Sequence, residues 1–534
     1  MIRLLTCVVA LAAASSATAQ DRGGGRVAVT PYVEVGQIFA ADLNDGEVLT
    51  YTSLAAGVDV AANTARVAGQ LSYRYERRIG WNDGAGDSDL HTGLLRAEAR
   101  VAPGLSIEAG GIATRTRADI RGSAPGLLVG ADDNISQVYA IYAGPRYAGH
   151  AGPVAIAASY QAAYTKVRTP ASLVLAEGQR PFDTYDDSLG HVAAISAGLS
   201  PNTLLPIGLT GSAGYEREDA GQLDARYEAY RVRGDVLAPV SANLAVIGGV
   251  GYERIETAQR DALVGANGSV IVDRNGRYAS DSNTPRRVAY RTDGVYYDVG
   301  LAWRPNRRTA VEGRIGRRYG STIYTGTLTY QASPRVGIAA NVYDSVTTFG
   351  QQLRGGLGNL PTSFVAARDS FTQQYTGCIY GTTVASPGGC LNSVFQSIST
   401  ASYRARGADA VIAASRGRAT FGTGIGYASR TLYAPAAAPG VVVSGLDDDS
   451  YYAQLFYRRT LSPVSVFDAT VSVNYYRSGQ ASGGEIWSYG GAASYGHAFG
   501  RLTTTASIGV YANESETVDA LWSAQALVAA RYSF

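Results

Sequence analysis

The sequence predicts an all-β fold, a single transmembrane antiparallel up-and-down β-barrel of about 22 strands (20–24), with no plug domain. Three observations support this prediction. Apolar and polar residues alternate in runs of about 10–14 residues from Gly25 to the C-terminus, which is the period of a strand with one apolar face. Short turns rich in Pro and Gly alternate with longer polar connections. The final run ends in an aromatic residue, Phe534.

The composition excludes several other classes of protein. The 534 residues are 46% hydrophobic, but no run of about 20 apolar residues follows the N-terminal region, so a polytopic helical membrane protein is excluded. A formal net charge of +2 argues against binding to nucleic acid. The 64 Gly and 36 Tyr residues disfavour a helical bundle, and the apolar fraction disfavours intrinsic disorder.

Residues 1–19 carry the pattern of a cleavable export signal. Arg3 precedes an apolar stretch, and Ala17-Thr18-Ala19 forms a small-x-small cleavage site. We therefore expect a signal peptide over residues 1–19, a barrel over residues 20–534 and a location in a Gram-negative outer membrane. The first strand pattern starts at Arg26, so we expect no plug ahead of the barrel.

The connections between strands are predicted from Pro, Gly and Asp. Ten short turns join the strands in pairs, and eleven longer connections, which hold most of the Asp, separate the pairs. The short turns lie at residues 61–64, 103–104, 149–153, 201–206, 239–240, 305–307, 334–335, 416–418, 462–463 and 499–501. This pattern gives the 22 strands.

The last strand indicates that the barrel lies in a membrane. Counting back from Phe534, every second residue is apolar as far as Trp522, including Tyr532, whereas Arg531 and Gln525 lie on the other face. At ~3.3 Å per residue and a tilt of ~40°, this strand spans about 30 Å, close to the apolar band of an outer membrane with its aromatic girdles. A soluble β-sandwich also alternates, but many long strands, paired turns and abundant Tyr favour the barrel.

An export signal, paired strands and a last strand ending Arg-Tyr-Ser-Phe resemble a Gram-negative outer-membrane β-barrel protein. In length and layout the chain also resembles the β-barrel porin family and the exopolysaccharide (exosortase)-associated outer-membrane barrel families. The resemblance implies contact with outer-membrane lipid and lipopolysaccharide. It also implies that Phe534, with Tyr532 and Trp522 on the same face, forms the signal that the barrel-assembly machinery recognises. The oligomeric state stays open.

Charged residues on the polar faces of the strands are the candidates for a functional site. In a barrel this wide they would line a water-filled lumen and set the selectivity for a polar solute, or they would pair with one another and stiffen the wall. The candidates are Arg74, Glu76, Arg96, Glu98, Arg100, Arg231, Arg233, Asp235, Glu312 and Arg314.

Two connections contain further features. Cys378 and Cys390 remain after signal cleavage, and in an oxidising compartment we expect a disulfide between them, in an extracellular loop. Asp447, Asp448 and Asp449 could hold a divalent cation, although turn Asp is the commoner explanation. His91 and His191 are expected at the outer rim, and no catalytic motif accompanies them.

Three functions are compatible with these patterns. The first is a passive or gated path for polar solutes, which could be saccharides. The second is an export or assembly component of an exopolysaccharide system, and the third is a structural barrel with an occluded lumen. The sequence predicts no enzyme activity, no cofactor and no metal site.

Overall fold

A computed structural model describes most of the chain and leaves out its first 25 residues, including the expected signal peptide. The described residues are 26–81, 86–118, 134–169, 185–266, 270–273, 277–365, 369–396, 398–435, 444–479, 484–516 and 518–534.

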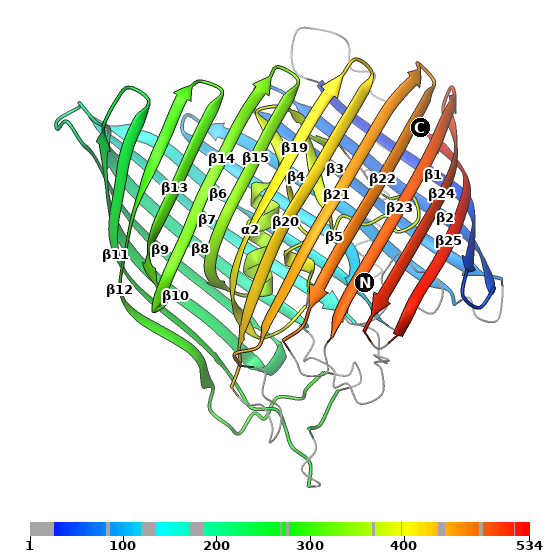
Figure 1. The fold of residues 1–534 in the computed structure, drawn as a ribbon, viewed down its shortest axis with the longest axis horizontal. Helices are drawn as coiled ribbons and strands as arrows, with labels where there is room; N and C mark the ends of the chain where they lie inside the picture. The colour runs from blue at the N-terminus through cyan, green and yellow to red at the C-terminus, as the bar shows by residue number, and fades with distance from the viewer. Residues whose placement is uncertain are drawn as a thin grey trace.

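Twenty-two antiparallel strands form a closed ring (Figure 1). Each strand pairs with the next one in the chain, except that β15 pairs with β19, and β25 closes the ring by pairing with β1. The strands are β1 (Arg26–Asp42), β2 (Val48–Asn63), β3 (Val67–Gly80), β4 (Ser88–Ala102), β5 (Leu105–Arg117), β6 (Ile135–Ala151), β7 (Val154–Arg168), β8 (Asp187–Leu199), β9 (Gly208–Ala220), β10 (Ala225–Pro239), β11 (Leu244–Gln259), β12 (Arg287–Asn306), β13 (Thr309–Arg318), β14 (Ser321–Ser333), β15 (Val336–Thr347), β19 (Ser402–Arg416), β20 (Ala419–Tyr433), β21 (Asp447–Ser462), β22 (Ser465–Arg477), β23 (Glu485–Phe499), β24 (Leu502–Ser515) and β25 (Val518–Ser533).

The predicted number of strands and all ten short turns are confirmed. The short turns lie at one end of the barrel and the longer connections at the other (Figure 1). One predicted longer connection is only Tyr319-Gly320, and both residues have positive φ (56° and 71°). Gly tolerates this conformation, which suits the twist of a tight hairpin.

The outer face of the barrel is apolar and carries aromatic residues near both ends. Exposed aliphatic side chains such as Val232, Val295 and Ile508 occupy the outward positions of the strands. At the end with the longer connections, Tyr427, Tyr451, Tyr475 and Trp487 form a row in which neighbouring ring centroids lie 4.8, 5.9 and 4.7 Å apart. This surface matches the lipid-facing side of a membrane barrel.

The last strand has the orientation that the sequence predicts. Trp522, Tyr532 and Phe534 are exposed on the outer face, whereas Ser523 and Gln525 are buried on the inner face. The backbone N–H of Phe534 donates to the carbonyl of Pro31 at 3.0 Å, which ties the end of the chain to β1.

The connection between β15 and β19 folds into the barrel, and we call residues 348–401 the lumen segment. It contains α2 (Phe349–Asn359), β16 (Phe364–Val365), β17 (Cys378–Thr383), β18 (Ser386–Cys390) and the 3-10 turn η3 (Val394–Gln396). Figure 1 shows α2 between the near and far walls. Because this connection lies inside the barrel, the prediction of an extracellular loop here was wrong. No helix in the described part of the chain is long and apolar enough to cross a membrane.

Candidate functional site in the barrel interior

Helix α2 is amphipathic. Phe349, Leu353 and Leu357 are buried and spaced four residues apart, so they form one apolar stripe. Thr348 caps the helix, because its hydroxyl accepts from the N–H of Gln351 at 3.2 Å. The same hydroxyl donates to the buried carboxylate of Glu218 on β9 at 2.6 Å, so the cap also fixes the helix to the wall.

The apolar stripe of α2 packs on an apolar patch of the inner wall. Leu94, Ile112 and Val138 project inward from β4, β5 and β6 and join Phe349 and Leu353 in one buried cluster. These strands therefore break the rule of apolar outside and polar inside that applies to much of the barrel. The inner wall is apolar where α2 covers it.

Polar side chains of the wall hold the rest of the lumen segment. They come from strands around most of the ring, so the segment reaches across the lumen. The contacts are Arg78 Nη2 to the Phe371 carbonyl (2.6 Å), Arg96 Nη2 to the Gly358 carbonyl (2.8 Å), the Phe364 N–H to Gln70 (2.9 Å), Arg354 to Gln161 (2.6 Å), Arg430 to the Val394 carbonyl (3.0 Å), Ser370 to Ser494 (2.7 Å) and Tyr511 to Asp369 (2.6 Å).

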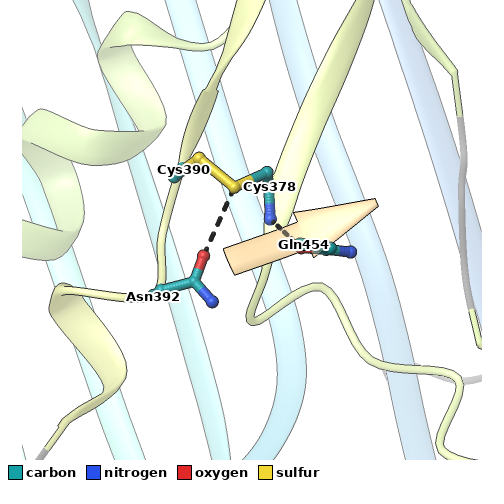
Figure 2. The surroundings of a disulfide bond; sticks show 4 residues. All are labelled: Cys378, Cys390, Asn392 and Gln454. Carbon is teal, nitrogen blue, oxygen red and sulfur yellow. Dashed lines mark hydrogen bonds between the residues drawn. A yellow bond between two sulfur atoms is a disulfide. The ribbon is translucent and has the colours of Figure 1, made fainter. Parts of the chain in front are cut away.

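The predicted disulfide between Cys378 and Cys390 is confirmed, with an S–S distance of 2.02 Å. It joins β17 to β18 and lies against the inner face of β20 and β21, not in an extracellular loop. The Cys378 N–H donates to the side chain of Gln454 on β21 at 2.7 Å, and Asn392 lies beside the sulfur atoms (Figure 2). On β20 the disulfide occupies the space over Gly424, where an added Cβ would be 2.1 Å from Cys378 Sγ.

A cavity of about 560 Å³ remains between the polar side of α2 and the wall from β9 to β15 and β19. We call it the charged cavity. Three Arg residues and three acidic residues line it, and two pairs form ion pairs, Arg231 with Glu216 (3.0 Å) and Arg318 with Glu253 (2.5 Å). The third Arg is Arg354 of α2, and the third acid is Asp409 of β19.

The predicted pore-lining residues on β3 and β4 lie on the inner face in different environments. Arg74 and Glu76 are buried and joined at 3.1 Å, and Arg74 also pairs with Glu34 of β1 at 2.9 Å. Arg96 is buried under the lumen segment. Glu98 and Arg100 follow Arg96 on the same face and are exposed nearer the short turns.

The remaining candidates include an ion-pair network that joins three strands of the wall. Arg233 contacts Asp235 at 2.7 Å and Asp298 at 2.6 Å, and Arg314 contacts the same two carboxylates at 2.8 and 3.0 Å. Arg314 also pairs with Glu312 at 2.8 Å. Asp298 is not among the predicted residues, although the alternation of β12 places it on the inner face. These contacts neutralise most of the charge of the two Arg residues and hold β10, β12 and β13 together. Arg231 lies outside this network and lines the charged cavity.

A second cavity, of about 210 Å³, lies between the lumen segment, the end of β5 and the wall from β21 to β24. We call it the neutral cavity, because its lining is mostly Ser, Thr, Asn, Gln and Tyr and includes only Arg117 and Asp369 as charged residues. Asp369 already accepts from the N–H groups of Phe371 (2.8 Å) and Thr372 (3.0 Å), besides Tyr511.

Two of the predicted Asp residues and two of the His residues at the outer end have partners within the chain. Asp449 pairs with Arg477 at 2.8 Å, and Asp448 is buried against Ser478 and Gly479. The ring of His91 contacts the Tyr73 hydroxyl at 2.8 Å on the outer face, and His191 contacts Tyr160 in the same way. The described residues contain no group of three or more metal-ligating side chains.

One acidic residue outside the strands organises a long connection. Asp224, in η2 (Gln222–Asp224), pairs with Arg260 at 2.8 Å and Arg286 at 2.5 Å. Burial acts to raise the pKa of Asp224, but the hydrogen bonds and charges of the two Arg residues outweigh it and hold the pKa below its usual value. Asp224 therefore ties the two ends of the connection between β11 and β12 to η2.

The chain is similar to solved structures, but only in its fold. No protein-family model and no curated protein matches the chain, so the resemblance to the two barrel families stays a prediction. Similar solved structures include the ferric-catecholate import receptor Fiu from Escherichia coli K12 (TM-score 0.46, 10% identity, 96% of this chain and 82% of that chain). They also include the FrpB iron transporter from Neisseria meningitidis (0.44, 9%, 95% and 82%) and the outer membrane protein OmpT of Vibrio cholerae, with loop L8 deleted (0.29, 9%, 96% and 99%). At these values the neighbours carry no argument about the function of this chain.

Proposed function

We propose that the protein is an outer-membrane channel for polar solutes, narrowed by its lumen segment. The apolar outer face and its aromatic rows support a place in a lipid bilayer, and closure of the ring satisfies the strand backbones there. The expected export signal supports the outer membrane as that bilayer. Solutes pass beside α2, on the side opposite its apolar stripe.

The charged cavity is the observation that carries this proposal. Apolar side chains and α2 fill the lumen along β4 to β7, but the opposite side keeps a space of about 560 Å³ lined by polar and charged groups. Equal numbers of Arg and acidic residues line that space. Such a lining replaces part of the hydration of a polar solute and excludes apolar ones.

Conductance through single molecules in a planar bilayer tests the channel. Wild-type protein should conduct, and Arg231→Gln should shift the reversal potential in a salt gradient toward cations, because Glu216 then loses its counter-charge. Arg254→Gln is the matched control, since Arg254 pairs with Glu256 on the outer face. Arg233 is unsuitable, because its replacement would break the ion-pair network. An unchanged reversal potential in Arg231→Gln would contradict passage through this cavity.

The lumen segment itself favours a second candidate function, a structural barrel with an occluded lumen. Its apolar cluster and its wall contacts would close the barrel if the charged cavity does not continue through it. Wild-type protein without conductance would support this alternative. The saccharide substrate and the exopolysaccharide export role stay predictions of the sequence.

A further inference from the structure

The neutral cavity differs chemically from the charged cavity. On β21, β22 and β23 the inward residues beside it are Ser450, Tyr452 and Gln454, then Thr470, Ser472 and Asn474, then Ser488. All are uncharged, and each has a group that hydrogen-bonds. The strand pairing places Tyr452 opposite Asn474 and Asn474 opposite Ser488, so these side chains form one continuous polar surface.

Several polar atoms in this lining have no partner within the described chain. Gln396 of η3 is 5% exposed, and neither its amide nitrogen nor its amide oxygen has a hydrogen-bond partner. The Ser450 hydroxyl (6% exposed) and the Tyr452 hydroxyl (6% exposed) also lack partners. The Tyr452 hydroxyl lies over Gly426 on β20, on the side away from β22. Buried polar groups are normally satisfied, so Gln396 and Ser450 are suited to a ligand that supplies both donors and acceptors.

We propose that the neutral cavity binds a small neutral polyhydroxylated solute, a monosaccharide or an acyclic polyol. Each sugar hydroxyl both donates and accepts, which matches the amide group of Gln396 and the hydroxyl group of Ser450. An ion entering the cavity would lose its hydration without gaining a free counter-charge, because Asp369 already accepts three hydrogen bonds and Arg117 already has a partner. A volume of about 210 Å³ is smaller than the usual ~300 Å³ minimum for drug-sized ligands, so one small ring fits better than an oligomer.

This inference rests on the proposed function in one respect, because the solute must enter the lumen from at least one end of the barrel to reach the cavity. It adds a substrate class and a place of binding, beside a different part of the wall from the charged cavity.

Saturation-transfer NMR on the folded full-length protein in detergent tests the site, with glucose, galactose and mannitol as probes. Gluconate and glucosamine are the charged counterparts of glucose. At least one neutral probe should receive saturation, and both charged compounds should bind about tenfold more weakly or not at all. Equal binding of glucose, gluconate and glucosamine, or no binding of any neutral probe, would overturn the proposal.

Two variants locate the binding. Gln396→Leu and Ser450→Ala should each weaken binding of the neutral probe by about tenfold, since each removes a buried hydrogen bond to the ligand. Ser212→Ala on β9 is the matched control, because Ser212 lies on the inner face outside both cavities. Heat-modifiable migration verifies that each variant folds. If Gln396→Leu does not fold, the result with Ser450→Ala, the smaller change, decides the test. Unchanged binding in the folded variants would place the sugar elsewhere and overturn the site.

Conductance of the same preparations separates the two proposals. Conductance without binding of any neutral probe would support the channel proposal and overturn the neutral site. Binding of glucose that depends on Gln396, without conductance, would support the neutral site and overturn the channel proposal.

Discussion

Gly424 on β20 contacts the disulfide that joins β17 to β18 in the lumen segment. A Cβ at this position would lie 2.1 Å from Cys378 Sγ and 2.8 Å from Cys390 Sγ, so no other residue fits without displacing the disulfide. We expect Gly424→Val to destabilise this contact by about 1–3 kcal/mol, the usual cost of overpacking. The displaced disulfide should be reduced faster by dithiothreitol in the folded protein, measured by thiol labelling.

Gly294→Val is the control for this experiment. Gly294 lies on the inner face of β12, and nothing lies within 4 Å of the position that its Cβ would take. In the Gly294→Val variant the disulfide between Cys378 and Cys390 should be reduced at the wild-type rate. Equal rates in all three proteins would contradict the contact between Gly424 and the disulfide.

Asp224 gives a prediction that depends on pH. Its folded pKa is lowered, so its stabilising effect is present at neutral pH and is lost as the pH falls through that pKa, below about pH 4. Asp224→Asn removes the same charge at pH 7.5. We expect trypsin to cleave reconstituted Asp224→Asn faster than wild type after Arg260 and Arg286, the two residues that Asp224 holds. Identical cleavage patterns would show that these ion pairs do not order the connection.

At this scale the sequence predicts which face a side chain occupies but not its partner. Alternation places Arg74, Arg233 and Arg314 on the inner face, as the structure has them. Their partners Glu34 and Asp298 come from other strands, and the register between strands decides which carboxylate lies opposite which guanidinium. No spacing within one strand contains that information.

The lumen segment is the element that the sequence does not predict. Its apolar spacing, Phe349, Leu353 and Leu357, is visible in the sequence and is typical of a helix. Four Gly residues between Phe349 and Asn359 disfavour a helix, and tertiary packing on the apolar wall overrides them. The inward Leu94, Ile112 and Val138 interrupt the expected pattern of polar inner positions, and this interruption is the signal that could have indicated a covered wall.

Removal of the lumen segment should open the barrel. Thr347 at the end of β15 is already opposite Tyr403 on β19, so a short Gly/Ser linker can replace residues 349–400 without moving either strand. We expect several-fold higher conductance, because the helix and hairpin no longer occupy the lumen. The melting temperature should fall, since the apolar patch of β4 to β6 becomes wetted. Unchanged conductance in a folded deletion variant would show that the segment does not narrow the path.

At the scale of the whole molecule, the strand count and turn positions follow from the sequence because they depend on a local period and on local turn chemistry. The closed ring follows indirectly, since lipid tolerates no unpaired strand edge. The two cavities do not follow, because each is bounded by the lumen segment and by strands distant in the chain.

Deletion of Phe534 should impair assembly of the whole barrel. The residue is exposed on the outer face, and its N–H bonds to Pro31, so its loss removes an aromatic anchor and a contact across the closing strands. We expect less heat-modifiable protein in outer-membrane fractions. Phe499→Ala, which removes an exposed aromatic side chain at a short turn, is the control and should assemble normally. Accumulation of the truncated chain as a soluble folded protein would contradict a membrane barrel.

The pairing of β1 with β25 also has a consequence for the order of folding. It joins Tyr32 to Ser533, near opposite ends of the chain, whereas almost all other wall pairings join consecutive strands. Contacts between distant residues form slowly, because the intervening chain must lose the most entropy. We therefore expect the hairpins to form first and the ring to close last. Until then the sheet has two open edges, and these need shielding from other chains.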